Sequence, residues 1–328
     1  MRILLADALD GGAVDALERR SHVLVSRADL TADTLPEAVS GFDVLVVRST
    51  RVTASTFAAA DQLGLVVRAG SGTNTIDCDA ASKAGVVVAN VPGANAVAVA
   101  ELTLGLVLAL DRHIPEQVVA ARDGSWDKRG FGRSRGLQGA TLGVVGLGAI
   151  GQAVAYRAAA FGMSLSFLDR PHRSASASAV VERLAMTPVD SLVELAASVD
   201  VLTVHVPSGK ATAGMVGADV LQALRPGSFF INTSRADVVD SDALLEVLDS
   251  GRIRAGLDVF PDEPADGQSS QWVSQLAAHP GVVATHHVGA STRQAQLAVS
   301  LGVVDVIASH EIGQTVNVVN PAAVSVGR

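Results

Sequence analysis

The sequence from residue 141 to residue 151 reads TLGVVGLGAIG, and this stretch decides the fold. The apolar run 141–145 predicts a β-strand, and glycines at 146, 148 and 151 complete the pattern G-x-G-x-x-G. Apolar residues then recur at the spacing of one helix face, at Ile150, Val154, Ala158 and Phe161. A strand, a glycine-rich turn and a helix in this order are typical of a dinucleotide-binding unit. A glycine-rich turn that binds no ligand is the alternative.

Each part of this turn has a chemical reason. Gly146 permits the tight turn, Gly148 lets the backbone approach a pyrophosphate, and Gly151 lets the helix pack closely on the strand. The helix N-terminus, at Ala149 and Ile150, offers free N–H groups and a positive dipole to phosphates. We therefore expect these five residues to bind the cofactor.

The acidic residue that this fingerprint requires follows the next predicted strand. That strand, 164–168, ends at Asp169, which lies 18 residues after Gly151. Its carboxylate would accept hydrogen bonds from the adenosine ribose hydroxyls and repel a 2′-phosphate, which favours NAD over NADP. Arg170 acts against this preference, because a nearby guanidinium attracts a 2′-phosphate.

Short apolar runs alternate with helical patterns along the whole chain, which indicates an α/β protein with parallel sheets covered by helices. Eleven strands are predicted, at 2–6, 23–25, 43–47, 65–68, 86–89, 141–145, 164–168, 201–204, 228–232, 254–257 and 282–285. Eleven strands are many for one sheet, so we expect two sheets. The segment 315–319 is also prone to form a strand.

Composition narrows the class of protein. The 328 residues carry 25 basic and 33 acidic side chains, a net charge of −8, which argues against nucleic-acid or membrane-surface binding. Cys78 is the one cysteine, so an intramolecular disulfide is impossible and no metal site is expected. The apolar stretch 97–110 is shorter than the ~20 residues of a membrane span. We expect a soluble, cytoplasmic protein.

Three side chains are singled out by a resemblance to a known dehydrogenase family, carried by the sequence blocks quoted below, and their chemistry also fits the oxidation of a 2-hydroxy acid. Arg235 follows the strand 228–232, at the carboxyl end where ligands bind, and its guanidinium suits a carboxylate. His287 follows the strand 282–285, and its imidazole would take the hydroxyl proton. Glu263 would orient that imidazole and raise its pKa. Taken singly, each of the three also fits a surface or structural role, and their combination favours catalysis.

Four blocks stand in a fixed order: GVVGLGAIG at 143–151, INTSRADVVD at 231–240, GLDVFPDEP at 256–264 and THHVGAST at 285–292. They resemble the signatures of the D-isomer-specific 2-hydroxyacid dehydrogenase family, over nearly the whole chain. The resemblance gives the three catalytic residues the roles above and NAD as cofactor. It implies further cofactor contacts at His205, Val206, Pro207, Thr233, Asp258 and Gly289. Thr233 and Asp258 would hold the nicotinamide carboxamide, and residues 205–207 would line the adenine site.

Further stretches resemble the phosphoglycerate dehydrogenase branch of the family, namely VRS at 47–49, RAGSGTN at 68–74, NVPGAN at 90–95 and VNVVNP at 316–321. The resemblance implies that the substrate is held by Arg48, Ser49, Ser71, Gly72 and Asn95 together with Arg235. Arg51, Arg133 and Arg135 are further candidates for contact with an anion. The blocks end near residue 321, so we expect a short form without a regulatory C-terminal domain.

The expected architecture is a Rossmann-type doubly wound domain, 97–287, inserted into a flavodoxin-like α/β substrate domain, 1–96 and 288–328. Helical patterns at 96–113 and about 292–311 would connect them, and 124–139 reads as a polar loop. The stretch 97–110 is apolar nearly all round, so we expect a subunit interface to cover it in a homodimer or homotetramer.

The function we expect is NAD-dependent oxidation of 3-phospho-D-glycerate to 3-phosphohydroxypyruvate, in serine synthesis. A glyoxylate or hydroxypyruvate reductase, or another D-2-hydroxyacid dehydrogenase, is the alternative enzyme. A dinucleotide-sensing corepressor without enzymatic activity is the alternative of another class.

Overall fold

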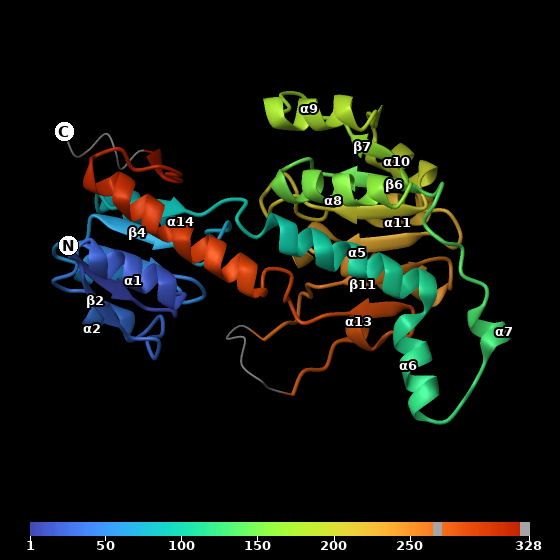
Figure 1. The fold of residues 1–328 in the computed structure, drawn as a ribbon, viewed down its shortest axis with the longest axis horizontal. Helices are drawn as coiled ribbons and strands as arrows, with labels where there is room; N and C mark the ends of the chain where they lie inside the picture. Colours follow the sequence, from blue (N-terminus) through green and yellow to red (C-terminus); the bar gives the residue numbers. More distant parts are fainter. Residues whose placement is uncertain (265–270, 322–328) are drawn as a thin grey trace. The chain divides into compact units, whose positions relative to one another are not determined.

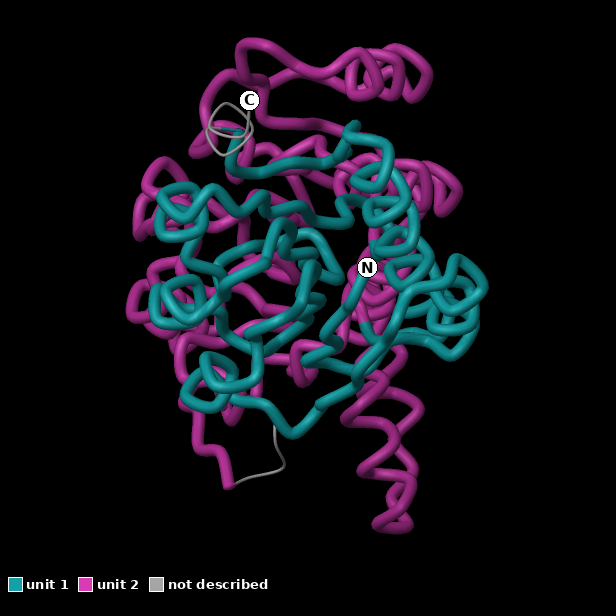
Figure 2. Tube along the Cα trace, turned by 90° about the vertical axis from the view of Figure 1, so that its left-hand side faces the viewer, with its two compact units in different colours: residues 1–95, 291–328 teal, residues 96–290 magenta. Residues whose placement is uncertain are grey.

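The computed structural model describes residues 1–264 and 271–321. The chain divides into two compact units: Met1–Asn95 with Ser291–Arg328 form unit 1, and Ala96–Ala290 form unit 2 (Figure 2). The sequence predicts divisions at 96/97 and 287/288, and the contacts within the structure place them at 95/96 and 290/291. The last seven residues of the expected substrate domain, 322–328, lie outside the described residues.

Unit 1 is built on a parallel sheet with the strand order β2-β1-β3-β4-β5 among its described residues. The strands are β1 Arg2–Leu5, β2 Val23–Ser26, β3 Val44–Val47, β4 Leu65–Arg68 and β5 Val87–Asn90. The helices are α1 Gly11–Arg19, α2 Leu35–Ala38, α3 Ala54–Ala59, α4 Cys78–Lys83 and α14 Arg293–Glu311. This is the flavodoxin-like order that the sequence predicts, and its switch point lies between β1 and β3.

Strict alternation along the strands gives unit 1 a core on each face of its sheet. Leu45 and Val47 of β3 pack into one cluster, and Val44 and Val46 pack into the other. The long helix α14 contributes Val303, Val306 and Ile307 to the second cluster and contacts β4 and β5 (Figure 1). A segment from the far end of the sequence therefore completes the core of the first five strands.

The tail after α14 does not form the expected strand 315–319. Among the described residues it makes one isolated antiparallel bridge, between Val318 and Ala89 of β5. Asn320 fastens it further, because its side chain accepts from the Val88 amide at 2.7 Å and donates to the Val86 carbonyl at 2.9 Å. Two backbone hydrogen bonds, from the Val319 amide to the Val88 carbonyl at 2.9 Å and from the Asn90 amide to the Asn317 carbonyl at 3.2 Å, complete this short pairing.

Unit 2 is built on a parallel sheet with the order β12-β11-β10-β9-β6-β7-β8 within the described ranges. The strands are β6 Thr141–Val145, β7 Ser164–Leu168, β8 Thr187–Val189, β9 Val201–Val204, β10 Phe229–Asn232, β11 Arg254–Leu257 and β12 Val282–Ala284. The order reverses between β6 and β9, as in a Rossmann fold, and confirms the predicted fold class. The sequence does not predict β8, an edge strand that contains Pro188.

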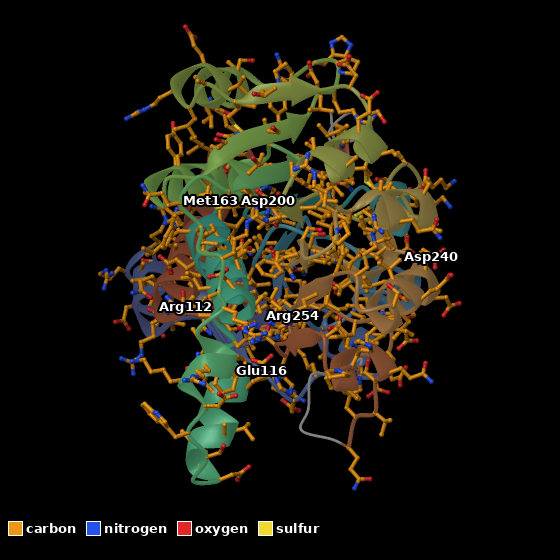
Figure 3. All side chains as sticks on the ribbon, turned by 90° about the vertical axis from the view of Figure 1, so that its right-hand side faces the viewer. Arg112, Glu116, Met163, Asp200, Asp240 and Arg254 are labelled. Atoms are coloured by element: carbon orange, nitrogen blue, oxygen red, sulfur yellow. The ribbon has the colours of Figure 1, made fainter. Side chains whose placement is uncertain are left out.

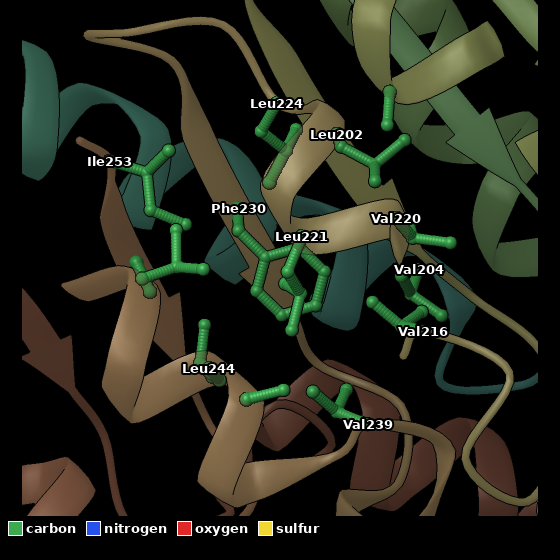
Figure 4. Packing of buried hydrophobic residues seen from close by; sticks show 14 of the residues in the cluster. Leu202, Val204, Val216, Val220, Leu221, Leu224, Phe230, Val239, Leu244 and Ile253 are labelled. Carbon is green, nitrogen blue, oxygen red and sulfur yellow. The ribbon is translucent and has the colours of Figure 1, made fainter. Parts of the chain in front are cut away.

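Unit 2 contains helices that cover both faces of this sheet and two, α6 and α7, that extend away from it (Figure 1). The helices are α5 Ala96–Arg112, α6 Ile114–Arg122, α7 Lys128–Phe131, α8 Ala149–Ala160, α9 Ala175–Arg183, α10 Leu192–Ser198, α11 Ala218–Ala223, α12 Ser241–Asp249 and α13 Gln275–Ala278, with a 3₁₀ turn at Ala236–Val238. On one face, Phe230 is fully buried among Leu202, Leu221 and Leu244 (Figure 4). This packing holds β9 and β10, whose carboxyl ends carry candidate site residues.

The apolar helix α5 is covered from within its own unit. It packs against α8, β10 and β11, and a Cβ at Gly256 of β11 would lie 2.9 Å from the Cβ of Leu106. Most of its apolar residues are therefore buried without a second subunit, and the expected homodimer or homotetramer stays a prediction.

After α5 the chain forms two further helices, and one of them, α7, lies within the predicted loop 124–139. His113 adopts a left-handed φ of 51° and ends α5, after which α6 and α7 extend away from the sheet (Figure 1). Judged on the described part of the chain, no residue of α6 is buried, so the helix has no apolar face toward the core. None of the described helices combines the length and the apolarity needed to cross a bilayer.

Candidate active site

The glycine-rich turn between β6 and α8 contains two glycines fixed by the protein itself. Gly146 has a φ of +99°, and a Cβ there would lie 2.8 Å from the carbonyl oxygen of His205. A Cβ at Gly151 would lie 2.0 Å from the carbonyl oxygen of Gly146. At Gly148, by contrast, no described atom lies within 4 Å of an added Cβ. The space beside Gly148 is therefore open, with the N-terminus of α8 behind it, and binding of a pyrophosphate there stays a prediction.

Helix α8 differs in one position from its predicted apolar face. Val154 and Ala158 are buried as expected, whereas Phe161 is 43% exposed. The helix ends at Ala160, so Phe161 lies past its last turn and leaves the face that the spacing predicts.

A cavity of about 460 Å³ opens beside this turn, at the carboxyl ends of β6 and β7. Gly146, Leu147 and Val206 line one part of it, and Arg170, His172 and Arg173 line another. Asp169, predicted to accept the ribose hydroxyls, forms an ion pair with Arg173. This pair was not foreseen from the sequence, because residues 169–173 form no helix and the i,i+4 rule for helical ion pairs does not apply to them.

His205, Val206 and Pro207 follow β9 across the switch point. His205 is buried, its Nε2 lies 2.9 Å from the Thr203 hydroxyl, and burial lowers its pKa to about 3. The imidazole is therefore neutral at physiological pH. The carbonyl of Pro207 accepts a hydrogen bond from Thr212, another residue that lines the cavity.

His287 and Glu263 form the pair that the sequence predicts. The Nδ1 atom of His287 lies 3.0 and 3.1 Å from the two carboxylate oxygens of Glu263. The hydrogen bond to Glu263 raises the pKa of His287, against the opposing effects of burial and of the positive charge on Arg235. His287 has a left-handed φ of 51°, an uncommon conformation for a residue with a side chain.

Asp258 fixes the loop that carries His287. Its buried carboxylate accepts hydrogen bonds from the Val288 amide at 3.0 Å, the Gly289 amide at 2.9 Å and the Thr285 hydroxyl. These three bonds tie both sides of His287 to the end of β11, which stabilises its backbone. The contact of Asp258 and Gly289 with a nicotinamide stays a prediction.

Arg235 lies directly after β10 and close enough to His287 to affect its pKa. Its Nη1 donates to the Ser234 carbonyl at 2.7 Å, and its own carbonyl accepts from the Asn232 side chain at 2.9 Å. Thr233 is buried, with its hydroxyl 3.0 Å from that of Thr103 in α5. The carboxyl ends of β10, β11 and β12 thus bring Arg235, Glu263 and His287 together.

Arg133 and Arg135, predicted to contact an anion, lie at the other end of the unit 2 sheet from the glycine turn. They line a separate cavity of about 220 Å³ at the amino ends of β9, β10 and β11, the sheet edge opposite the glycine turn. Arg135 pairs with Asp200 at 2.6 Å. Arg254 pairs with Glu116 at this edge (Figure 3). A loop sequence alone does not tell which end of a sheet the loop crosses, and contact of Arg133 and Arg135 with an anion stays a prediction.

In unit 1, Arg48 and Ser49 follow β3, at the switch point of that sheet. The carboxylate of Asp7, just after β1, accepts from the Arg48 amide at 2.7 Å and from the Ser49 amide at 3.2 Å and hydroxyl at 3.0 Å. It also accepts from the Thr50 amide at 3.1 Å. Asp7 organises this loop, and the sequence reasoning missed it.

Ser71, Gly72 and Asn95 lie beyond the ends of β4 and β5, also in unit 1. The Ser71 hydroxyl is 3.4 Å from the side-chain oxygen of Asn95, and the Ser71 carbonyl accepts from the Asn90 side chain at 2.5 Å. The structure therefore brings Ser71 and Asn95 together. Their contact with a substrate remains a prediction.

Comparisons with known proteins agree with this geometry. A sequence model of the D-isomer specific 2-hydroxyacid dehydrogenase NAD binding domain matches residues 104–289. The chain is 39% identical over 300 residues to D-3-phosphoglycerate dehydrogenase of Methanocaldococcus jannaschii, covering 91% of this chain and 55% of that protein. It is 37% identical over 308 residues to hydroxypyruvate reductase of Thermotoga maritima, covering 93% and 97%. A solved structure from Thermus thermophilus matches with a TM-score of 0.84 and 32% identity, covering 97% of this chain and 100% of that one.

The chain therefore belongs to the D-isomer specific 2-hydroxyacid dehydrogenase family, and unit 2 contains the family's NAD-binding domain. It spans about half the length of the D-3-phosphoglycerate dehydrogenases it matches, and nearly the whole of the Thermotoga maritima hydroxypyruvate reductase.

Proposed function

We propose that the protein is an NAD-dependent dehydrogenase that interconverts a D-2-hydroxy acid and its 2-oxo acid. The observation that carries this proposal is the hydrogen-bonded pair of His287 and Glu263, at 3.0–3.1 Å, beside Arg235. A base, its orienting carboxylate and a carboxylate-binding cation are the groups that this oxidation requires.

In the oxidation direction, the substrate loses a proton from its hydroxyl and a hydride from C2, and a C=O bond forms. The guanidinium of Arg235 binds the substrate carboxylate and places C2 and its hydroxyl. Bound NAD⁺ supplies the hydride acceptor.

The orientation of His287 identifies the nitrogen that takes the proton. Glu263 engages Nδ1, so Nδ1 carries the ring proton and Nε2 is left as the base. When Nε2 takes the hydroxyl proton, the adjacent carboxylate stabilises the imidazolium that forms. In the reverse direction, Nε2 returns the proton to the carbonyl oxygen.

For the particular substrate, we propose 3-phospho-D-glycerate, oxidised to 3-phosphohydroxypyruvate. Arg48 supports this choice, because it lies at the switch point of the unit 1 sheet, where ligands of open α/β sheets bind. We assign Arg48, Ser49, Ser71, Gly72 and Asn95 to the substrate.

Hydroxypyruvate is the second candidate substrate. The Thermotoga maritima hydroxypyruvate reductase favours it, since that relative is matched over 97% of its length.

Purified protein with NAD⁺ and a panel of 3-phospho-D-glycerate, D-glycerate and D-lactate, followed by NADH absorbance, tests the activity. The reverse panel uses NADH with 3-phosphohydroxypyruvate, hydroxypyruvate and glyoxylate. Turnover on the phosphorylated pair is expected. Activity on the unphosphorylated acids alone would overturn the phosphate assignment, and no turnover on any acid would overturn the enzyme proposal.

Two variants sharpen the test. His287→Ala should abolish turnover while NADH still binds. His279→Ala is the matched control, because His279 packs away from the site, with its Nε2 3.3 Å from Asp249. Arg48→Gln should raise the KM for 3-phospho-D-glycerate far more than that for D-glycerate.

A further inference from the structure

We propose that the adenosine end of the cofactor site accepts NADP as well as NAD, with Arg173 and Arg170 binding the 2′-phosphate. This inference rests on the proposed use of a nicotinamide dinucleotide by the site. It concerns the residues directly after β7, where the discrimination between the two cofactors occurs in Rossmann folds.

The first observation is that the carboxylate of Asp169 is already paired. Arg173 donates to it from four residues further along the chain. The pair is about one-third exposed, with 31% for Asp169 and 33% for Arg173, so water screens it only in part. A free aspartate repels a 2′-phosphate, whereas this pair carries no net charge. The barrier that normally excludes NADP is therefore weakened.

The second observation is the set of residues that face the cavity. Arg170, His172 and Arg173 line it, whereas Asp169 is absent from its lining among the described residues. Two arginines and a histidine thus line the cavity, and the carboxylate of Asp169 pairs with Arg173. Guanidinium groups bind phosphate through paired, charge-assisted hydrogen bonds.

The third observation is that Arg173 is held in place on its other side. The central carbon of its guanidinium lies 5.2 Å from the centre of the ring of Phe167, near the end of β7, in a cation–π contact. An arginine held between an aromatic ring and a carboxylate loses less conformational freedom when a phosphate binds.

The same contacts predict opposite effects on the two cofactors. The ribose hydroxyls of NAD need the carboxylate of Asp169, so Arg173 competes with them. The 2′-phosphate of NADP needs Arg173 and gains nothing from a free Asp169. Removing the arginine should therefore weaken NADP binding and strengthen NAD binding.

Binding measurements test this without turnover. We would titrate the protein with NADH and NADPH by nicotinamide fluorescence, and with 5′-ADP and 2′,5′-ADP by calorimetry. The expected result is a Kd for NADPH within about tenfold of that for NADH, and 2′,5′-ADP binding more tightly than 5′-ADP.

The variants assign the effect to residues. Arg173→Gln and Arg170→Gln should each weaken NADPH and 2′,5′-ADP by about tenfold or more, the loss of a charge-assisted hydrogen bond. Arg173→Gln should also lower the Kd for NADH. Arg183→Gln is the matched control, since Arg183 lies at the other end of α9 over the Tyr156 ring, and it should change neither Kd.

The outcomes separate this inference from the proposed function. NADH binding with NADPH more than about a hundredfold weaker would overturn the inference and leave the dehydrogenase proposal standing. Equal weakening of NADH and NADPH by Arg173→Gln would also overturn it, because a structural role alone predicts that result. Failure of both cofactors to bind would overturn the proposed function itself.

Discussion

Replacing Gly148 and Gly151 by alanine separates two reasons for glycine within one turn. Gly151 is required by the protein, because its Cβ would lie 2.0 Å from the carbonyl oxygen of Gly146. Gly148 is free of any such contact with the described atoms within 4 Å. We expect Gly151→Ala to destabilise unit 2. We expect Gly148→Ala to leave the fold intact and to weaken the binding of the cofactor.

The magnitude for Gly151→Ala follows from that overlap. An ordinary contact is 3.4 Å or more, so α8 must move away from β6 by a distance comparable to a bond length. Overpacking of this kind costs about 1–3 kcal/mol. In a domain of this size, each kcal/mol lowers Tm by about 2–4 °C, so the Tm of unit 2 should fall by roughly 2–12 °C.

The magnitude for Gly148→Ala is a balance of two small effects. Gly148 is the N-cap of α8, with φ −70° and ψ −170°, a conformation open to alanine. Alanine is a poorer N-cap by about 0.5–1 kcal/mol, and it gains about 0.4–1 kcal/mol by restricting the unfolded chain. Tm should therefore stay within about 2 °C. A methyl group at the predicted pyrophosphate site should raise the Kd for NADH by about 5- to 150-fold, the equivalent of 1–3 kcal/mol.

Thermal unfolding by circular dichroism and NADH titration by fluorescence measure both effects on the same samples. Gly105→Ala on α5 is the control, since no atom in the described part of the chain lies within 4 Å of its Cβ, and it should keep NADH affinity. Wild-type NADH affinity in Gly148→Ala would refute the assignment of the pyrophosphate site. An unchanged Tm in Gly151→Ala would refute the packing argument.

Three further changes have defined outcomes. Glu263→Gln removes the partner that raises the pKa of His287. Because His287 must be neutral in the oxidation direction, the rise of kcat/KM with pH should move to lower pH. An unchanged pH profile would contradict the pairing. Arg235→Gln should raise the KM for the hydroxy acid by about 10- to 150-fold, the equivalent of 1.5–3 kcal/mol, with the unfolding curve unchanged, and steady-state kinetics at saturating NAD⁺ would show it. Phe230→Ala should cost about 3–5 kcal/mol in urea unfolding, because the ring is fully buried, and a loss under 1 kcal/mol would exclude the packing described.

The parts of the fold that the sequence predicts are those with continuous apolar runs. Strands β6 and β7 begin and end where the apolar pattern does, because their residues pack into cores on both faces. Strand β8 has three residues, with Pro188 at its centre, and helix α6 is exposed along its length. Elements that bury little apolar surface leave no periodic signal for a sequence to display.

The same distinction holds for the candidate site. The pairing of His287 with Glu263 follows from two residues placed at neighbouring strand ends. Asp7 was missed because its partners lie 41 to 43 residues away, and no spacing rule links an aspartate to such distant amides. The orientation of Asp169 toward Arg173 also depends on side-chain geometry, which the acidic fingerprint alone does not specify.

The contribution of α14 to unit 1 has a consequence for synthesis on the ribosome. Unit 2 ends at Ala290, so all of its residues emerge before Val303 and Ile307, which complete the core over β1, β3 and β4. The five strands of unit 1 are made first, and more than 200 residues separate β5 from that part of α14. At about 5–20 residues per second, the nascent chain carries one apolar sheet face that, of the described helices, only α1 covers in part for roughly 10–40 s, while the later-made nucleotide-binding unit is already free to fold.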